Sequence, residues 1–263
     1  MSEPIPEPGI LTSTKLPPER YLELIATGSA RLSEVAELGL DADVPSCPGW
    51  QVRDVLMHTA EVYQHKIACI RENTAPDPWP PPEFEGFEPR GFFARSTEDL
   101  LRQLDTSGPD QPSFTWYAED QSTGFWFRRM AQEIAVHRYD AELAHEVTTP
   151  IDPVLAVDGI DELLRLMLGG PWWADYDTAH PVDATMRIDS GGRFWLADVG
   201  PSAVTVTDES YDGIAHPEVT ATITGEPESV LLWLWGRRRD DAVTLDGDAQ
   251  VIAELRARVA ECT

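Results

Sequence analysis

The spacing of apolar residues changes near residue 173, and this change constrains the fold more than any other feature. Before it, apolar residues recur every three or four positions, as on the buried face of a helix, whereas after it they alternate as in a strand. Helices followed by strands predict an α+β protein with two domains. We predict a flexible arm over residues 1–15, a four-helix bundle over 16–150 and a smaller α/β domain over 151–263.

The helical part is interrupted by a proline-rich stretch. Six prolines lie within residues 73–95, and no helix or central strand tolerates that density. We therefore expect an irregular connection there, followed by a short third helix whose start Ser96 and Asp99 would cap. The predicted helices run from Pro17 to Gly39, from just after Trp50, from Ser96, from about Gly124 to about His145, and from Asp152 to Leu168.

The later part reads as strands separated by glycine and proline turns. Asp189–Gly192 carries a hairpin signal between the first two strands. Two further helices are expected, over Pro227–Arg238 and Asp248–Glu261. The predicted strands are Ala184–Ile188, Phe194–Val199, Val204–Val206, Val219–Ile223 and Val243–Leu245.

The acidic composition excludes several kinds of partner. The chain has 46 Asp and Glu against 20 Lys and Arg, a formal net charge of −26. Such a charge repels phosphate, so we expect no nucleic acid and no membrane partner, and a monomer or weak homodimer. A small anionic substrate stays possible, because one local cation or metal reverses the field inside a pocket.

The sequence also predicts a cytoplasmic protein. Three scattered cysteines do not make a disulfide framework and fit a reducing compartment. The first residues lack the basic-then-apolar pattern of a signal peptide. The apolar run Val230–Trp235 is too short to span a bilayer.

Three residues on two predicted helices can form a metal site. Glu133 and His137 are four residues apart, so both project from one face of their helix. His58 interrupts the apolar stripe of the second helix and would meet that pair in an antiparallel bundle. Two histidines and one glutamate leave a position open for water or substrate, as in catalytic zinc sites. The same spacing also occurs in solvated surface pairs, so periodicity permits the site without establishing it.

Other side chains offer competing interpretations. His65 lies seven residues after His58 on the same face and is a competing ligand. Cys47 precedes a helix N-terminus, which can lower a thiol pKa, although a buried structural role is the better interpretation. The run Arg237, Arg238 and Arg239 can complement the end of a helix or supply a cation to a substrate.

Three motifs carry a resemblance to a known family. They are Cys47-Pro-Gly-Trp50-Gln-Val-Arg-Asp54-Val-Leu-Met-His58, Glu133-Ile-Ala-Val-His137-Arg-Tyr-Asp140 and Gly225-Glu-Pro-Glu-Ser-Val-Leu-Leu-Trp-Leu-Trp-Gly-Arg237. Together they make the chain, from about residue 16 to about 260, similar to the mycothiol-dependent maleylpyruvate isomerase family. The resemblance implies a DinB-like four-helix bundle followed by a sterol-carrier-like α/β domain.

The resemblance also implies a cofactor and a chemistry. It assigns His58, Glu133 and His137 as ligands of a divalent metal, zinc by expectation, and mycothiol, an actinobacterial thiol, as cosubstrate. The metal would activate the thiol for addition to a small-molecule electrophile, giving an isomerase or a thiol S-transferase. Asp140 would orient a ligand imidazole or be a plain surface acid. Arg237 would pair with the carboxylate of an anionic substrate.

Two other functions remain open at this point. A zinc-dependent hydrolase would use the same three ligands with water in place of a thiol. A non-catalytic carrier of a lipid or other small molecule would use the second domain alone, and it would have no need of an open metal site. The sequence does not identify the second substrate, and the proline-rich segment would affect its choice if it lined the pocket.

Overall fold

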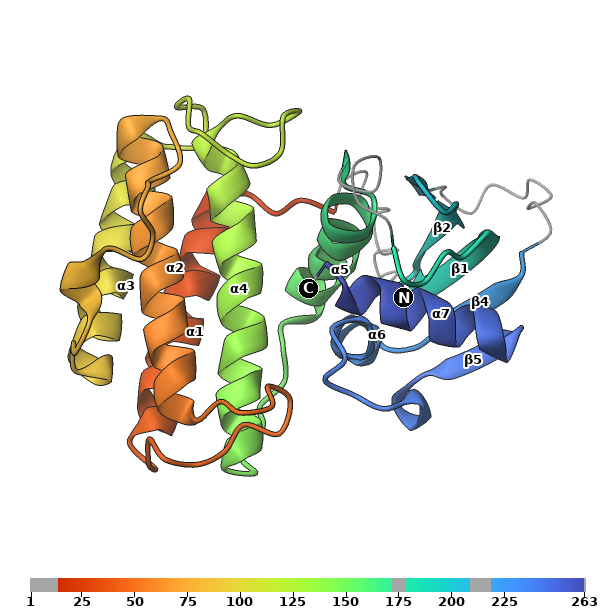
Figure 1. Cartoon of the computed structure of the whole chain (residues 1–263), viewed down its shortest axis with the longest axis horizontal. Coiled ribbons are helices and arrows are strands. Elements are labelled where there is room, and N and C mark those ends of the chain that lie inside the picture. The colour runs from red at the N-terminus through yellow and green to blue at the C-terminus, as the bar shows by residue number, and fades with distance from the viewer. Residues whose placement is uncertain (1–13, 172–177, 209–218, 263) are drawn as a thin grey trace, which may run out of the picture.

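Four long helices form one side of the molecule (Figure 1). The computed structural model describes residues 14–171, 178–208 and 219–262, so the predicted arm lies almost wholly outside the described residues. The predicted first, second and fourth helices are confirmed, each within one to three residues at the ends that the sequence predicted. The helices are α1 (Pro18–Ala36), α2 (Val52–Glu72), α3 (Pro89–Ser107) and α4 (Thr123–Ala144).

Helices α2 and α4 run antiparallel, and this orientation places the candidate site. His58, near the start of α2, contacts Glu133 at the middle of α4. Lys66, two turns further along α2, lies over the ring of Trp126 near the start of α4. Side chains eight residues apart on α2 therefore face one continuous stripe of α4.

The start of the third helix was predicted wrongly. Helix α3 begins at Pro89 rather than Ser96, because proline is well tolerated in the first turn, where its missing N–H has no partner to lose. The Glu88 carboxylate caps this end by accepting hydrogen bonds from the backbone N–H groups of Arg90 and Gly91. The irregular connection is thus confined to residues 73–88, which include the short helix η1 (Pro82–Phe84).

A mixed five-stranded sheet forms the other side of the molecule. Its order is β3-β2-β1-β4-β5, with β1 and β4 parallel and every other neighbouring pair antiparallel. Strand β1 buries every second residue, as its alternating pattern predicts. The strands are β1 (Ala184–Ser190), β2 (Arg193–Val199), β3 (Val204–Asp208), β4 (Ala221–Thr224) and β5 (Thr244–Gly247).

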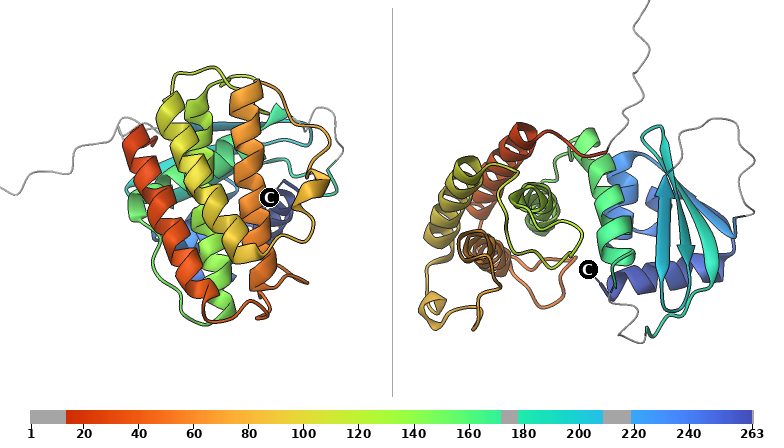
Figure 2. Two further views of the ribbon diagram at one scale, coloured as in Figure 1. Left: turned by 90° about the vertical axis from the view of Figure 1, so that its left-hand side faces the viewer. Right: turned by 90° about the horizontal axis from the view of Figure 1, so that it is seen from above.

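Two helices separate the sheet from the bundle (Figure 2). They are α5 (Pro153–Glu162), which continues as the π-helical turn η2 (Leu163–Leu168), and α6 (Pro227–Leu234). Helix α6 ends four residues earlier than predicted, because Gly236 adopts a left-handed conformation that stops the helix. A short helix η4 (Asp240–Ala242) precedes β5, and α7 (Ala249–Ala260) is the last helix of the described chain.

The α+β class and the helices-then-sheet order are confirmed. We keep the division into residues 16–150 and 151–263 as a proposal; it falls between α4 and α5. Within the described ranges, no helix combines the length and the apolar character needed to cross a membrane.

Candidate metal centre and its cavity

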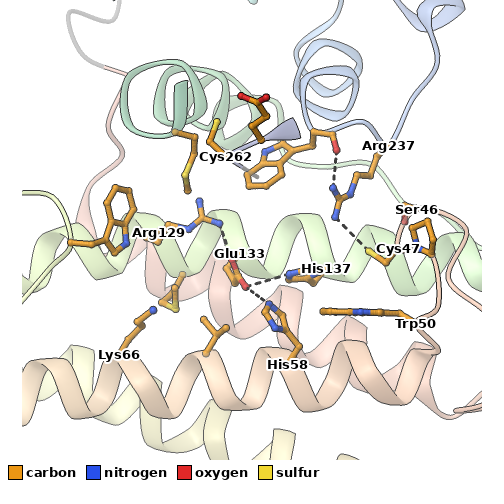
Figure 3. A pocket seen from close by; sticks show the side chains of 17 residues that line it. Ser46, Cys47, Trp50, His58, Lys66, Arg129, Glu133, His137, Arg237 and Cys262 are labelled. Carbon is orange, nitrogen blue, oxygen red and sulfur yellow. Dashed lines mark hydrogen bonds and ion pairs between the residues drawn. The ribbon is translucent and has the colours of Figure 1, made fainter. Parts of the chain in front are cut away.

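A cavity of about 1050 Å³ lies between the helical bundle and the second half of the chain. We call it the central cavity. Helices α2 and α4 supply one wall, including His58, Glu133 and His137, and the segment after α6 supplies Trp235 and Arg237 (Figure 3). No residue of the proline-rich stretch 73–95 lines it. That stretch therefore does not shape the cavity directly.

The three predicted ligands meet at the centre of this cavity (Figure 3). The Nε2 atoms of His58 and His137 lie 3.2 Å and 3.3 Å from the same carboxylate oxygen, Oε1 of Glu133. One donor atom from each residue falls within 4.8 Å of the other two. The imidazole of His58 is 37% exposed and that of His137 12%, so His58 is the more accessible of the two.

The donor set fits a divalent metal. A tetrahedral ion bound at about 2.0–2.1 Å holds its donors roughly 3.4 Å apart, and the distances from Oε1 of Glu133 to the two imidazoles match that spacing. The other oxygen of Glu133 accepts a hydrogen bond from Arg129 Nη2 at 2.8 Å. This bond fixes the carboxylate and leaves Oε1 directed at both imidazoles.

The titration of the cluster reflects the same crowding. Burial favours the neutral acid, yet the charge and hydrogen bonds of His137, together with His58 and Arg129, hold the pKa of Glu133 well below its usual range. Burial also disfavours a charged imidazole, but Glu133 and Asp140 raise the pKa of His137 to about 9. Each imidazole thus faces an anion, which a cation or a proton must balance.

Asp140 supports His137 from behind. Its carboxylate lies 3.1 Å from Nδ1 of His137, which leaves Nε2 of that ring to face the cluster. The carboxylate is fully buried, and it also accepts hydrogen bonds from Arg237 and, at 2.6 Å, from Ser46. Burial would raise the pKa of Asp140, but His137 and Arg237 lower it strongly. Of the two interpretations of Asp140, the geometry matches the orienting one.

Arg237 reaches the cavity because α6 ends in a Schellman turn. Gly236 takes a left-handed φ of +74°, the N–H of Gly236 donates to Trp233 O, and the N–H of Arg237 donates to Leu232 O at 2.7 Å. The turn ends α6 before the arginine run and directs Arg237 toward the bundle. Its two neighbours do not line the cavity: Arg238 pairs with Glu228, and Arg239 is exposed.

The guanidinium fork of Arg237 already has a carboxylate partner. Nε and Nη2 each lie 3.0 Å from an oxygen of Asp140, and Nη1 donates to Trp235 O. The sequence predicted that Arg237 would make this bidentate pairing to a substrate carboxylate. In the structure the pairing is made to Asp140. Arg237 is placed to orient His137 through Asp140.

The segment before α2 closes one end of the cavity. Pro48 and Gly49, with φ of +86°, form a turn closed by the N–H of Trp50 donating to Cys47 O. The ring of Trp50 stacks on His137, with centroids 6.2 Å apart. Burial, and then the neighbouring Asp140, raises the pKa of Cys47 to about 11. Cys47 is thus held as a thiol, against the reactive interpretation.

His65 is not part of the cluster. Its Nδ1 lies 3.2 Å from Lys66 Nζ and 3.4 Å from Cys69 Sγ, and among the described residues His58, Glu133 and His137 form the single metal-binding group. Burial, with the adjacent Lys66, lowers the pKa of His65 to about 4.

Two functional candidates in the cavity wall were missed by the sequence analysis. Arg129 lies four residues before Glu133, and Lys66 lies eight residues after His58, so each shares a helix face with a predicted ligand. A search for charged residues at multiples of four from the ligands would have found both.

Comparison with known proteins identifies the family. A family model described as the mycothiol maleylpyruvate isomerase N-terminal domain matches residues 21–142, and one described as the MDMPI C-terminal domain matches residues 154–254. The chain belongs to the mycothiol-dependent maleylpyruvate isomerase family. The predicted resemblance to this family is confirmed.

Solved structures of the family share the fold. The crystal structure of the mycothiol-dependent maleylpyruvate isomerase covers 91% of this chain and 98% of its own at 16% identity, with a TM-score of 0.59. A histidine-to-alanine mutant of that enzyme gives 15% identity and a TM-score of 0.58 over the same shares. A UbiJ-SCP2 ubiquinone synthesis protein covers 44% of this chain at 18% identity, but its TM-score of 0.28 supports no inference. No curated protein matches the chain.

Proposed function

We propose that this member of the maleylpyruvate isomerase family is a metal-dependent enzyme that uses a small thiol, mycothiol by its family, to attack a small electrophile. The observation that carries the proposal is the convergence of His58, Glu133 and His137 on one point of the central cavity. These three side chains would hold the metal, with zinc as the expected ion. When bound, the metal supplies the positive charge that keeps a thiol sulfur ionised at neutral pH.

The surrounding residues hold the ligands in place. Asp140 keeps Nδ1 of His137 occupied, so Nε2 faces the site. Arg129 fixes one oxygen of Glu133. The ring of Trp50 packs against the imidazoles of both His58 and His137. These contacts restrict rotation of the two imidazole rings. They favour a site whose geometry is already formed before a metal binds.

The cavity favours an external nucleophile. Cys47 lines it, but burial raises the pKa of that thiol to about 11, and Cys262 is likewise held as a thiol, because burial raises its pKa to about 12. A cosubstrate thiol held by the metal would be ionised at neutral pH, whereas the thiols of Cys47 and Cys262 are not. Its sulfur would add to one carbon of a double bond conjugated to a carbonyl. The electron pair of that double bond would move onto the carbonyl as an enolate, and the bond would become single.

Two outcomes follow from that adduct. Rotation about the single bond, then loss of the thiolate, restores the double bond with changed geometry and releases the thiol unchanged, which is an isomerisation. Protonation of the neighbouring carbon and release of the adduct is an S-transfer. The three ligands serve both outcomes equally, so the substrate decides between them.

Metal analysis with a matched pair of variants tests the proposal. The wild-type protein should hold about one divalent metal per chain. His137→Ala should lower metal content and thiol-dependent turnover more than about 100-fold, since a direct ligand matters more than its supporting groups. His145→Ala is the control, because His145 lies at the end of α4, outside the cavity, where its imidazole is hydrogen-bonded to Gly39 O. It should keep both metal and activity.

Other results would redirect the proposal. Full metal occupancy in His137→Ala would reject the ligand assignment. Stoichiometric metal with turnover that needs no thiol would favour a zinc-dependent hydrolase. Binding of an apolar ligand by a protein that takes up no metal would favour a carrier.

A further inference from the structure

The charge of Lys66 is the feature of the central cavity that the proposed function does not use. The chain has two lysines, Lys15 and Lys66, and Lys66 projects from α2 into the cavity (Figure 3). Eight residues of helix, about 12 Å of rise, separate it from His58. The ammonium and Arg237 lie on opposite sides of the metal-ligand cluster (Figure 3).

Lys66 has neutral partners. Its Nζ lies 3.2 Å from Nδ1 of His65 and 4.9 Å from the ring centroid of Trp126. In the part of the chain that the structure describes, no carboxylate oxygen lies within 4.0 Å of this ammonium. Burial lowers the pKa of Lys66, and the charge of Glu133, which is not in contact with the ammonium, offsets this lowering only in part.

The neutral partners hold the ammonium in place. His65 has a pKa lowered to about 4, so at neutral pH its ring is uncharged and Nδ1 can accept a hydrogen bond. The ring of Trp79, from the proline-rich stretch, packs edge-on against His65 at 4.9 Å. The proline-rich stretch therefore supports Lys66 from outside the cavity through His65.

The other two cations of the cavity are compensated. Arg129 pairs with both Glu133 and Glu162. Arg237 pairs with both oxygens of Asp140. Among the described residues that line the cavity, Lys66 is the cation without a carboxylate partner. A buried cation in that state favours an anion as its ligand.

We propose that Lys66 binds a carboxylate of the electrophilic substrate and so makes the enzyme selective for acids. The inference rests on the proposed function, because it names the substrate class of the same site. The reacting double bond then lies toward His58, Glu133 and His137, with the charged end toward Lys66. The chain is strongly acidic, so the rest of its surface does not attract an anionic substrate. Selectivity for acids therefore needs a local cation inside the cavity.

Two conjugated ketones test the selectivity. Acetylacrylate carries a carboxylate at the far end of its double bond, and ethylideneacetone carries a methyl group there. Lys66→Gln should raise KM for acetylacrylate about 10- to 100-fold, the range for a lost hydrogen bond to a charged group. KM for ethylideneacetone should stay within about twofold. Lys15→Gln is the control, since it removes the same charge at an exposed position that pairs with Asp120.

Binding of an inert acid keeps the test independent of turnover. Calorimetry with succinate on the metal-loaded protein should show binding to the wild type and to Lys15→Gln, and binding about 10-fold weaker or more to Lys66→Gln. Lys66→Met repeats the test with a side chain of similar length, and thermal unfolding checks that each variant is folded.

The outcomes separate this inference from the proposed function. Equal succinate affinity and equal KM for acetylacrylate in wild type and Lys66→Gln would overturn the role of Lys66, even with metal and thiol dependence intact. Loss of activity toward both ketones alike would also overturn it, because that points to a structural role. Absence of metal or thiol dependence in the wild type would overturn the proposed function, and the succinate titration would still report on Lys66.

Discussion

The two ends of the central cavity handle positive charge in opposite ways. At one end, Arg237 comes from the second half of the chain and has both of its fork nitrogens on Asp140, a carboxylate of the bundle. At the other end, Lys66 comes from α2, and within the described part of the chain the groups that contact its ammonium, His65 and Trp126, are neutral. The first cation is compensated inside the protein, whereas the second is not.

This difference separates a supporting role from a binding role. A compensated, buried ion pair has a fixed geometry, and here it ends on Nδ1 of His137. It is suited to orient a metal ligand. An ammonium without a carboxylate partner is suited to accept one from a substrate. On our proposals, one cavity cation therefore serves the metal ligands and the other serves the substrate.

The largest expected effect comes from breaking the compensated end at Asp140. Asp140→Asn leaves Arg237 and His137 facing an amide that has one acceptor oxygen and an NH₂ group. We expect a loss of about 3 kcal/mol or more in the free energy of unfolding, the range for a disrupted buried ion pair. Metal affinity should fall about 10- to 100-fold, because Nδ1 of His137 loses its charged acceptor.

Urea unfolding and competition with a chelator measure these two losses. Asp189→Asn is the control; this half-buried acid pairs with Arg187 in β1, away from the cavity. Unchanged metal affinity in a folded Asp140→Asn protein would contradict the orienting role of the pair.

The comparison also shows what the sequence could predict. Helical and alternating spacing located the bundle and the sheet, because each pattern reflects the periodicity of a buried face. Pro89 misled the prediction of α3, because proline is compatible with the first turn of a helix but not with its interior. The end of α6 was placed too late, since a Schellman turn depends on the conformation of Gly236, which apolar spacing does not report.

The site was predictable where it follows one helix and not where it joins two regions. The i, i+4 spacing placed Glu133 beside His137, and the antiparallel packing of α2 and α4 added His58. The position of Arg237 at the cavity came from the family resemblance. Its partner Asp140 lies 97 residues away in sequence, and that pairing depends on how the second half docks. Whether a cavity cation has a carboxylate partner therefore depends on tertiary packing, which the sequence alone does not report.

A smaller effect is expected from Arg237→Lys. Lysine keeps the charge but loses the fork that contacts both oxygens of Asp140. We expect a loss of about 1–2 kcal/mol in the free energy of unfolding and a severalfold weaker metal affinity, with KM for a charged electrophile nearly unchanged. Arg239→Lys is the control, since Arg239 is exposed and outside the cavity.

A double-mutant cycle sharpens the role of Arg237. If Arg237 acts through Asp140, Asp140→Asn combined with Arg237→Lys should cost little more metal affinity than Asp140→Asn alone. Additive losses, or a KM effect confined to Arg237→Lys, would instead place Arg237 in direct contact with the substrate.

The smallest expected effect tests how the fold delivers Arg237 to the cavity. Gly236 adopts φ of +74°, and a Cβ added there would meet nothing within 4 Å. Gly236→Ala therefore introduces backbone strain without a clash, so the free energy of unfolding should fall by about 1 kcal/mol. Gly236→Asn is the matched control, because asparagine tolerates the left-handed region better than alanine and should cost less.

If the Schellman turn sets the position of Arg237, metal affinity should fall slightly in Gly236→Ala and less in Gly236→Asn. If Gly236→Ala and Gly236→Asn had the same stability and the same metal affinity, the ion pair with Asp140 would hold Arg237 independently of the turn at the end of α6. The lysine end of the cavity should respond to neither variant, because Lys66, His65 and Trp126 all lie in the bundle.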